Sequence, residues 1–127
     1  MVEQSSLEDA YKELIHFVEK YPTVFPIMHS TLFMQILRSL TTAKDLIRLK
    51  AIFPFVEAED LEQILVLLIN VGLVAKFKAS NKEFYHASDL GKRFLELYDR
   101  AKLALLRGGL EEIKLKPKTE KKNPDAL

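Results

Sequence analysis

The chain lacks cysteine, so it can form no disulfide, no thiolate metal site and no cysteine nucleophile. It also lacks a long hydrophobic segment, because the apolar run ILVLLINVGLV is too short to cross a bilayer. The first residues, MVEQSSLEDAYKEL, carry acids where a signal peptide requires bases. These absences predict a cytoplasmic protein with no membrane contact. At 127 residues and 48% apolar content, the chain is large enough for one folded domain.

Residue patterns typical of catalytic and metal sites are missing as well. His16, His29 and His86 are scattered and have no ligand partners at metal-site spacing. The sequence contains no glycine-rich phosphate loop and no serine nucleophile elbow. Paired acids sit at predicted helix starts, where capping explains them. We therefore predict a protein that is not an enzyme and that uses neither a cofactor nor a metal.

Charge is unevenly distributed, although the formal net charge is only +1. Residues 1–30 carry two bases and five acids, and residues 51–75 carry four acids and no base. Residues 31–50 carry four bases and one acid, and residues 76–107 carry eight bases and four acids. Any affinity for nucleic acid must therefore come from local clusters of bases.

Hydrophobic periodicity predicts a mainly helical chain with one small antiparallel β-hairpin. Helices are expected over residues 7–20, 30–40, a short stretch after residue 42, residues 57–71, and from residue 88 or 89 to the glycines at 108 and 109. Lys76 and Lys78 alternate with Ala75 and Phe77, which is strand periodicity. The segment 80–82 supplies a turn, and residues 84–86 form the return strand.

Turn and capping residues set the expected boundaries of these elements. Ser6 with Asp9 and Thr42 with Asp45 form potential N-terminal capping pairs. Pro22 and Pro26 are expected to interrupt the chain, and Gly72 and the Gly108-Gly109 pair to end helices. Residues 1–113 are predicted to form one domain. Residues 114–127 are charged and contain proline, and are predicted to be a disordered tail.

Three segments carry a likeness to a known family: Thr42–Leu46, the apolar helix that ends in Val71-Gly72-Leu73-Val74, and Phe84–Tyr98. Together they resemble winged helix-turn-helix regulators, and are similar to the small archaeal group whose wing leads into a long C-terminal dimerisation helix. In that group the return strand runs into Thr or Ser, two residues, Gly, and then Phe-Leu-Glu. Ser88, Gly91 and the segment 94–96 occupy similar places here.

This resemblance covers roughly residues 28–106 and implies a winged helix-turn-helix fold with extra N- and C-terminal helices. It also implies a homodimer that binds double-stranded DNA. One departure from the family pattern is a longer link between the scaffold helix and the next helix, through residues 50–54. The same fold also serves as a protein-docking module, so the resemblance is more specific for the fold than for the function.

The first functional hypothesis is a DNA-binding transcription regulator or chromatin-associated protein. The helix expected to enter the groove presents Glu59, Asp60 and Glu62, which would repel phosphates, and only Gln63 is a good base reader. Backbone contacts are instead expected from bases on the wing, on or near the scaffold helix and at the start of the last helix. These candidates are Lys76, Lys78, Lys82, Lys44, Arg48, Lys92 and Arg93.

The alternative hypothesis is a protein-interaction module that uses the acidic and apolar helix 57–71 as its docking face. Val66, Leu67 and Ile69 make this helix apolar nearly all round, so either the first helix or a partner must cover them. A second candidate interface is a seam on the last helix, which could equally pack on the first helix: Phe94, Tyr98, Ala101 and Leu105. Bases that converge on one side would favour DNA, whereas exposure of the apolar residues of helix 57–71 would favour a protein partner.

Overall fold

The computed structural model describes the backbone of residues 2–122 and the side chains of residues 8–107. This part of the chain is mainly α-helical and contains one two-stranded antiparallel sheet, which confirms the predicted fold class. It divides into two compact units. The core unit is Phe17–Glu96, and the helical unit combines the residues up to His16 with those from Leu97 onward.

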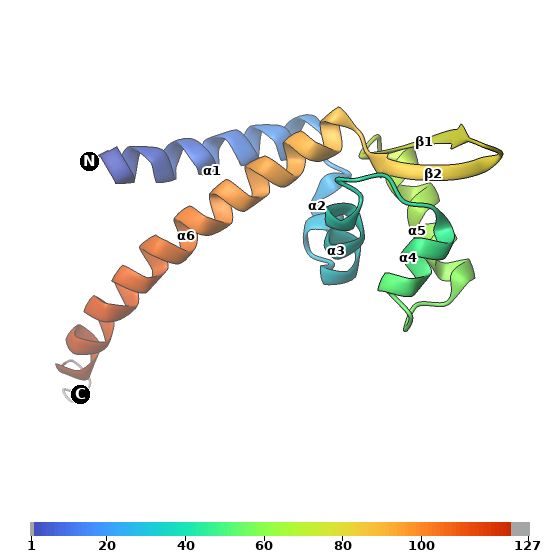
Figure 1. Cartoon of the computed structure of the whole chain (residues 1–127). Coiled ribbons are helices and arrows are strands. Elements are labelled where there is room, and N and C mark those ends of the chain that lie inside the picture. Colours follow the sequence, from blue (N-terminus) through green and yellow to red (C-terminus); the bar gives the residue numbers. More distant parts are fainter. Residues whose placement is uncertain (1, 123–127) are drawn as a thin grey trace. The chain divides into compact units, whose positions relative to one another are not determined.

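Figure 1 shows the elements in chain order. Two long helices contribute to both units: α1 (Val2–Lys20) and α6 (Asp89–Lys122). The remaining elements belong to the core unit: α2 (Val24–Met28), α3 (Thr31–Ser39), α4 (Leu46–Ile52), α5 (Ala58–Asn70), β1 (Val74–Ala79) and β2 (Lys82–Ala87). Within this unit the hairpin contacts α3, α4 and α5.

The core unit is held together by apolar side chains that recur at helical spacing. In α5, Leu61, Leu65 and Leu68 are buried on one side of the helix, and Ile64 beside them is half-buried. They share the core with Val24, Ile36, Leu37, Leu40, Leu49, Leu73 and Phe94, each of which is almost completely buried. No polar side chain is buried among the described residues. The hydrophobic effect is therefore the main force that stabilises this unit.

Two helices of the core unit begin at residues whose side chains accept a backbone hydrogen bond. The Oγ of Ser30 accepts from the N–H of Phe33 at 3.2 Å at the start of α3. The Oδ1 of Asp45 accepts from the N–H of Arg48 at 2.8 Å at the start of α4. Asp45 and not Thr42 is thus the cap of α4, which corrects the predicted capping pair.

Two predicted helix boundaries near the N-terminus also need correction. The helix α1 begins at Val2, so Ser6 lies inside it and does not mark its start. Pro26 lies inside α2 and does not interrupt the chain. Because α2 begins at Val24, Pro26 occupies the first helical turn, where its missing N–H would have had no helical partner.

The hairpin is closed by a two-residue turn. Ser80 and Asn81 both have positive φ values, 52° and 65°, which is the pattern of a type I′ turn. Such a turn follows the right-handed twist of the strands and fixes their register, so that Ala79 pairs with Lys82. On the other side of β2, Lys44 and Tyr85 form an isolated antiparallel bridge.

A compact junction joins α5, β1 and α6. Gly72 has a φ of 88° and ends α5, as predicted. The Oγ of Ser88 donates to the carbonyl oxygen of Gly72 at 2.6 Å and accepts from the N–H of Gly91 at 3.0 Å. A Cβ atom on Gly91 would lie 2.1 Å from the carbonyl oxygen of Leu73. Ser88 and Gly91 are therefore needed to bring the start of α6 onto the chain that follows α5.

In the helical unit, α1 and α6 are linked by an ion pair between Glu13 and Arg100, with 3.0 Å between the Oε1 and NH1 atoms. The helix α6 continues through Gly108-Gly109 to Lys122, beyond its predicted end. Residues 114–122 of the predicted tail are therefore part of α6, while residues 123–127 lie outside the described part. The division into a domain and a disordered tail stays a prediction.

None of the helices in the described part of the chain is long and apolar enough to span a membrane.

Candidate interaction surfaces

The outward side of α5 is acidic in its first half and apolar in its second. We call this surface the α5 face, and it consists of Glu59, Glu62, Gln63, Val66 and Leu67, all exposed. These positions follow one another at intervals of one, three or four residues, so they lie along one side of the helix. The face is therefore continuous and carries no base.

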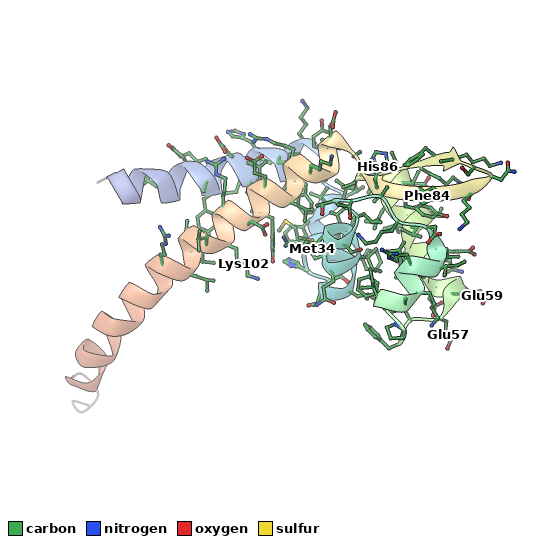
Figure 2. All side chains as sticks on the ribbon, viewed as in Figure 1. Met34, Glu57, Glu59, Phe84, His86 and Lys102 are labelled. Atoms are coloured by element: carbon green, nitrogen blue, oxygen red, sulfur yellow. The ribbon has the colours of Figure 1, made fainter. Side chains whose placement is uncertain are left out.

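The acidic end of α5 is open to solvent. Glu57, Glu59, Asp60 and Glu62 are all exposed, and Figure 2 shows Glu57 and Glu59 at the end of α5 that lies away from the hairpin. Negative charge in the first turn stabilises the helix through its dipole. It also gives this end of the α5 face a negative potential, which opposes the approach of a phosphate.

The apolar end of the α5 face is also uncovered. Val66 is 55% exposed and Leu67 is 43% exposed, while Ile69 is half-buried. No other element of the core unit therefore covers Val66 and Leu67. Exposure of the apolar residues of this helix is the feature that was expected to favour a protein partner over DNA, and it is present at Val66 and Leu67.

The field of the acids reaches the hairpin. Burial, then the charge of Glu83, then that of Glu62 raise the pKa of the Tyr85 phenol above its ordinary value of 10.0. Glu62 lies on α5 and Tyr85 on β2, so the inner side of the hairpin borders the acidic surface.

Two lysines near α4 hold loops in place. The ammonium group of Lys44 donates to the carbonyl oxygen of Ser39 and to the Oγ1 of Thr42. The ammonium group of Lys50 donates to the carbonyl oxygens of Pro54, at 2.8 Å, and Val56, at 2.7 Å. Lys44 precedes α4 and does not lie on it. As a DNA contact it would first have to leave these bonds.

The bases of the hairpin are exposed, but two of them have acidic neighbours. Lys76 lies 3.8 Å from Glu83, and Lys82 lies 3.9 Å from Asp45. Exposed pairs at these distances are weak, so both lysines can exchange partners. Lys78 is exposed next to them on β1.

The bases of α4 and α6 differ in their surroundings. Arg48 is exposed one turn after Asp45, which accepts from the backbone N–H of Arg48 and lies 3.9 Å from the ammonium group of Lys82. Lys92 and Arg93 are exposed at the start of α6, where Arg93 pairs with Glu96 at 3.2 Å. The predicted bases are therefore spread over the hairpin, α4 and the start of α6.

The predicted seam on α6 is altered by burial. Phe94 and Ala101 are buried within the chain, so neither side chain is exposed for contact with a partner. Phe94 stacks on Phe17 of α1, with ring centroids 5.7 Å apart. Tyr98 is half-buried and Leu105 is exposed.

An aromatic cluster on the hairpin was missed by the sequence reasoning. Phe77 packs against Phe84, with ring centroids 5.6 Å apart, and against His86, with centroids 5.5 Å apart. Figure 2 shows Phe84 and His86 along β2. The turn could have revealed this cluster, because a two-residue connection at Ser80 and Asn81 places Phe77 directly opposite Phe84.

Comparison with protein-family models, with curated proteins and with solved structures finds no match to this chain.

Proposed function

We propose that the chain is a winged-helix protein-interaction module whose α5 face docks a basic and partly apolar segment of another protein. The observation that carries this proposal is the composition of the exposed face, which has Glu59 and Glu62 at one end and Val66 and Leu67 at the other. The element order α3, bridge, α4, α5, β1, β2 supports the winged-helix part of the proposal. The cytoplasmic location expected from the sequence is kept within the proposal.

Electrostatics favours a protein over DNA on this surface. A phosphate 4 Å from one carboxylate is repelled by about 1 kcal/mol in water, and by more where water is excluded. DNA also offers little apolar surface to cover Val66 and Leu67. A protein segment can do both, because covering apolar area stabilises a complex by about 25 cal/mol per Å².

The chemistry of the face specifies the partner segment. Lysines or arginines should meet Glu59 and Glu62, and aliphatic or aromatic side chains should meet Val66 and Leu67. An amphipathic helix that presents anchors at helical spacing satisfies both conditions. An acidic segment does not.

The first test is photo-crosslinking in cells from p-benzoylphenylalanine placed at Val66. The control places the same group at Ile15 of α1, where the exposed fraction is similar, 51% against 55%. The proposal expects a discrete protein adduct from Val66 that is not formed from Ile15. The adduct is identified by mass spectrometry, and the partner is purified for a binding titration.

The titration then uses charge reversal. We expect Glu59→Lys with Glu62→Lys to weaken the complex by about tenfold or more, because two favourable contacts become repulsive. Glu8→Lys with Asp9→Lys makes the same change of net charge on α1, where both side chains are exposed, and should leave the affinity unchanged. Equal effects of the two double variants, or an acidic contact segment, would refute the proposal.

A second candidate function is contact with the backbone of duplex DNA through the hairpin lysines. The observation in its favour is the exposure of Lys76, Lys78 and Lys82 on one hairpin. Fluorescence anisotropy with a labelled mixed-sequence duplex at low and moderate salt tests it. Binding that weakens with salt and in the triple variant Lys76→Ala, Lys78→Ala, Lys82→Ala supports this candidate. The absence of binding at low salt excludes it.

A further inference from the structure

The two faces of the hairpin differ in composition. Strand register places Ala75 with His86, Phe77 with Phe84, and Ala79 with Lys82 on one face. The opposite face holds Val74, Ala87 and Tyr85, which are buried, so it is the one that packs on the core unit. The first face is therefore the outer one. We call the group Phe77, Phe84 and His86 the aromatic face.

The rings of the aromatic face form a small platform. The Phe77 and Phe84 rings are nearly parallel, with an interplanar angle of 18° at a centroid distance of 5.6 Å. His86 meets Phe77 edge-on at 63°. A cross-strand aromatic pair stabilises a hairpin by itself, but that role requires the rings only to cover one another. Phe77 keeps 42% of its surface exposed, which leaves room for a further ring.

One lysine lies on the same face as this platform. Lys82 lies on this face at the tip of the hairpin, whereas the register places Lys76 and Lys78 on the inner face. The outer edge of β1 has no partner among the described residues, so the side of the platform along β1 is open. Glu83 lies opposite Lys78 in the strand register, on the inner face. The Oδ2 of Asp45 lies 3.9 Å from the ammonium group of Lys82, and its Oδ1 accepts from the N–H of Arg48.

We propose that the aromatic face binds single-stranded nucleic acid. One base stacks on Phe77, and a neighbouring phosphate contacts Lys82, which lies on the same face. Stacked aromatic side chains beside lysines are the usual means of holding unpaired bases, because every base has a π-face and every nucleotide a phosphate. A duplex keeps its bases stacked inside, so it cannot use an exposed phenylalanine in this way. This site is separate from the α5 face and does not depend on its function.

The test uses a tryptophan placed in the platform. The chain has no tryptophan, so Phe77→Trp creates a single fluorescent reporter that preserves an aromatic ring. An oligothymidylate of about 12 nucleotides spans a binding site of this kind. We expect saturable quenching of the tryptophan emission as the oligonucleotide is added, because a stacked base quenches indole fluorescence, and we expect the apparent affinity to fall as salt is raised.

Affinity measurements on the full chain complete the test. By fluorescence anisotropy of the labelled oligonucleotide, Phe77→Ala should weaken binding about tenfold, as expected for the loss of one stacked base. Phe55→Ala is the matched control, because Phe55 is an exposed phenylalanine outside the hairpin. Circular dichroism melting of each variant shows whether the fold is kept, and the Phe77→Trp titration does not depend on the alanine variant.

Three results would overturn the proposal. The first is no binding of the oligonucleotide at low salt, and the second is binding without quenching of the Phe77→Trp emission. The third is equal affinity for a duplex of the same length, which would assign the lysines to duplex backbone contact and leave the aromatic face without a role in it.

Discussion

The packing around Gly91 leaves no room for a side chain. A methyl group there would meet the backbone carbonyl oxygen of Leu73, which cannot move aside as a side chain can. We expect Gly91→Ala to lower the free energy of unfolding by at least about 2 kcal/mol. Urea unfolding followed by circular dichroism measures this loss.

Gly72→Ala provides the comparison for that prediction. The φ of Gly72, 88°, is unfavourable for alanine. The nearest atom to the new methyl group, however, would be the end of the Leu90 side chain at 3.6 Å. The expected loss is about 1 kcal/mol, from backbone strain alone. A larger loss at Gly72 than at Gly91 would show that close packing is not what the glycine at position 91 provides.

The phenol of Tyr85 gives the stability a dependence on alkaline pH. Its pKa is raised in the folded chain by burial and then by the charges of Glu83 and Glu62, so the folded state holds this proton more tightly than the unfolded state. Stability from this group is therefore complete below the ordinary value of 10.0 and is lost as the pH rises through the raised pKa.

The corresponding measurement compares urea unfolding of the natural chain and of Tyr85→Phe at pH about 9 and about 11. The natural chain should lose more stability than the variant between these two values. Ultraviolet titration of Glu62→Gln should show a Tyr85 pKa closer to its ordinary value. Identical losses in the natural chain and the variant would mean that Tyr85 ionises in both states alike.

At the scale of single elements, the turn of the hairpin can be improved. Ser80 and Asn81 both adopt positive φ, and a type I′ turn prefers asparagine followed by glycine at these positions. We expect Ser80→Asn with Asn81→Gly to stabilise the fold by about 0.5–1 kcal/mol, because the left-handed conformation is then less strained. A rise in the thermal midpoint is the expected observation, and Ser80→Val should have the opposite effect.

The elements themselves were predictable where local physics decides them. The helix predicted over residues 57–71, its end at Gly72 and the hairpin follow from periodicity and turn chemistry, and the structure contains each of them. Pro26 was misjudged because a proline in the first turn of a helix looks the same in sequence as one that ends a helix.

The candidate surfaces were harder to predict, because exposure depends on what packs over each residue. Periodicity places Val66 and Phe94 on faces of their helices, yet only the three-dimensional packing leaves Val66 uncovered and buries Phe94 against Phe17. The bonds of Lys44 to the end of α3 likewise depend on where a long side chain finds carbonyl oxygens. From the sequence, Lys44 was therefore predicted to be available for contact with DNA.

At the scale of the whole molecule, the core unit contains the groups it needs to fold by itself. Its most deeply buried side chains, from Val24 to Phe94, come from residues 17–96, which also supply the caps and the hairpin. We expect a fragment of residues 17–96 to unfold cooperatively and to retain the dispersed amide spectrum of a folded domain in nuclear magnetic resonance. A collapsed spectrum without a cooperative transition would show that the helical unit is required.

The division between the two units falls inside α1, between His16 and Phe17, and inside α6, between Glu96 and Leu97, so no loop lies at either boundary. Proteases cut extended, exposed segments and avoid regular helices. Limited digestion should therefore open the chain first at surface loops such as the one between α4 and α5, and it should not release the two units as separate fragments. The backbone is helical on both sides of each boundary, so a protease, which recognises the local conformation of the backbone, has no preferred site there.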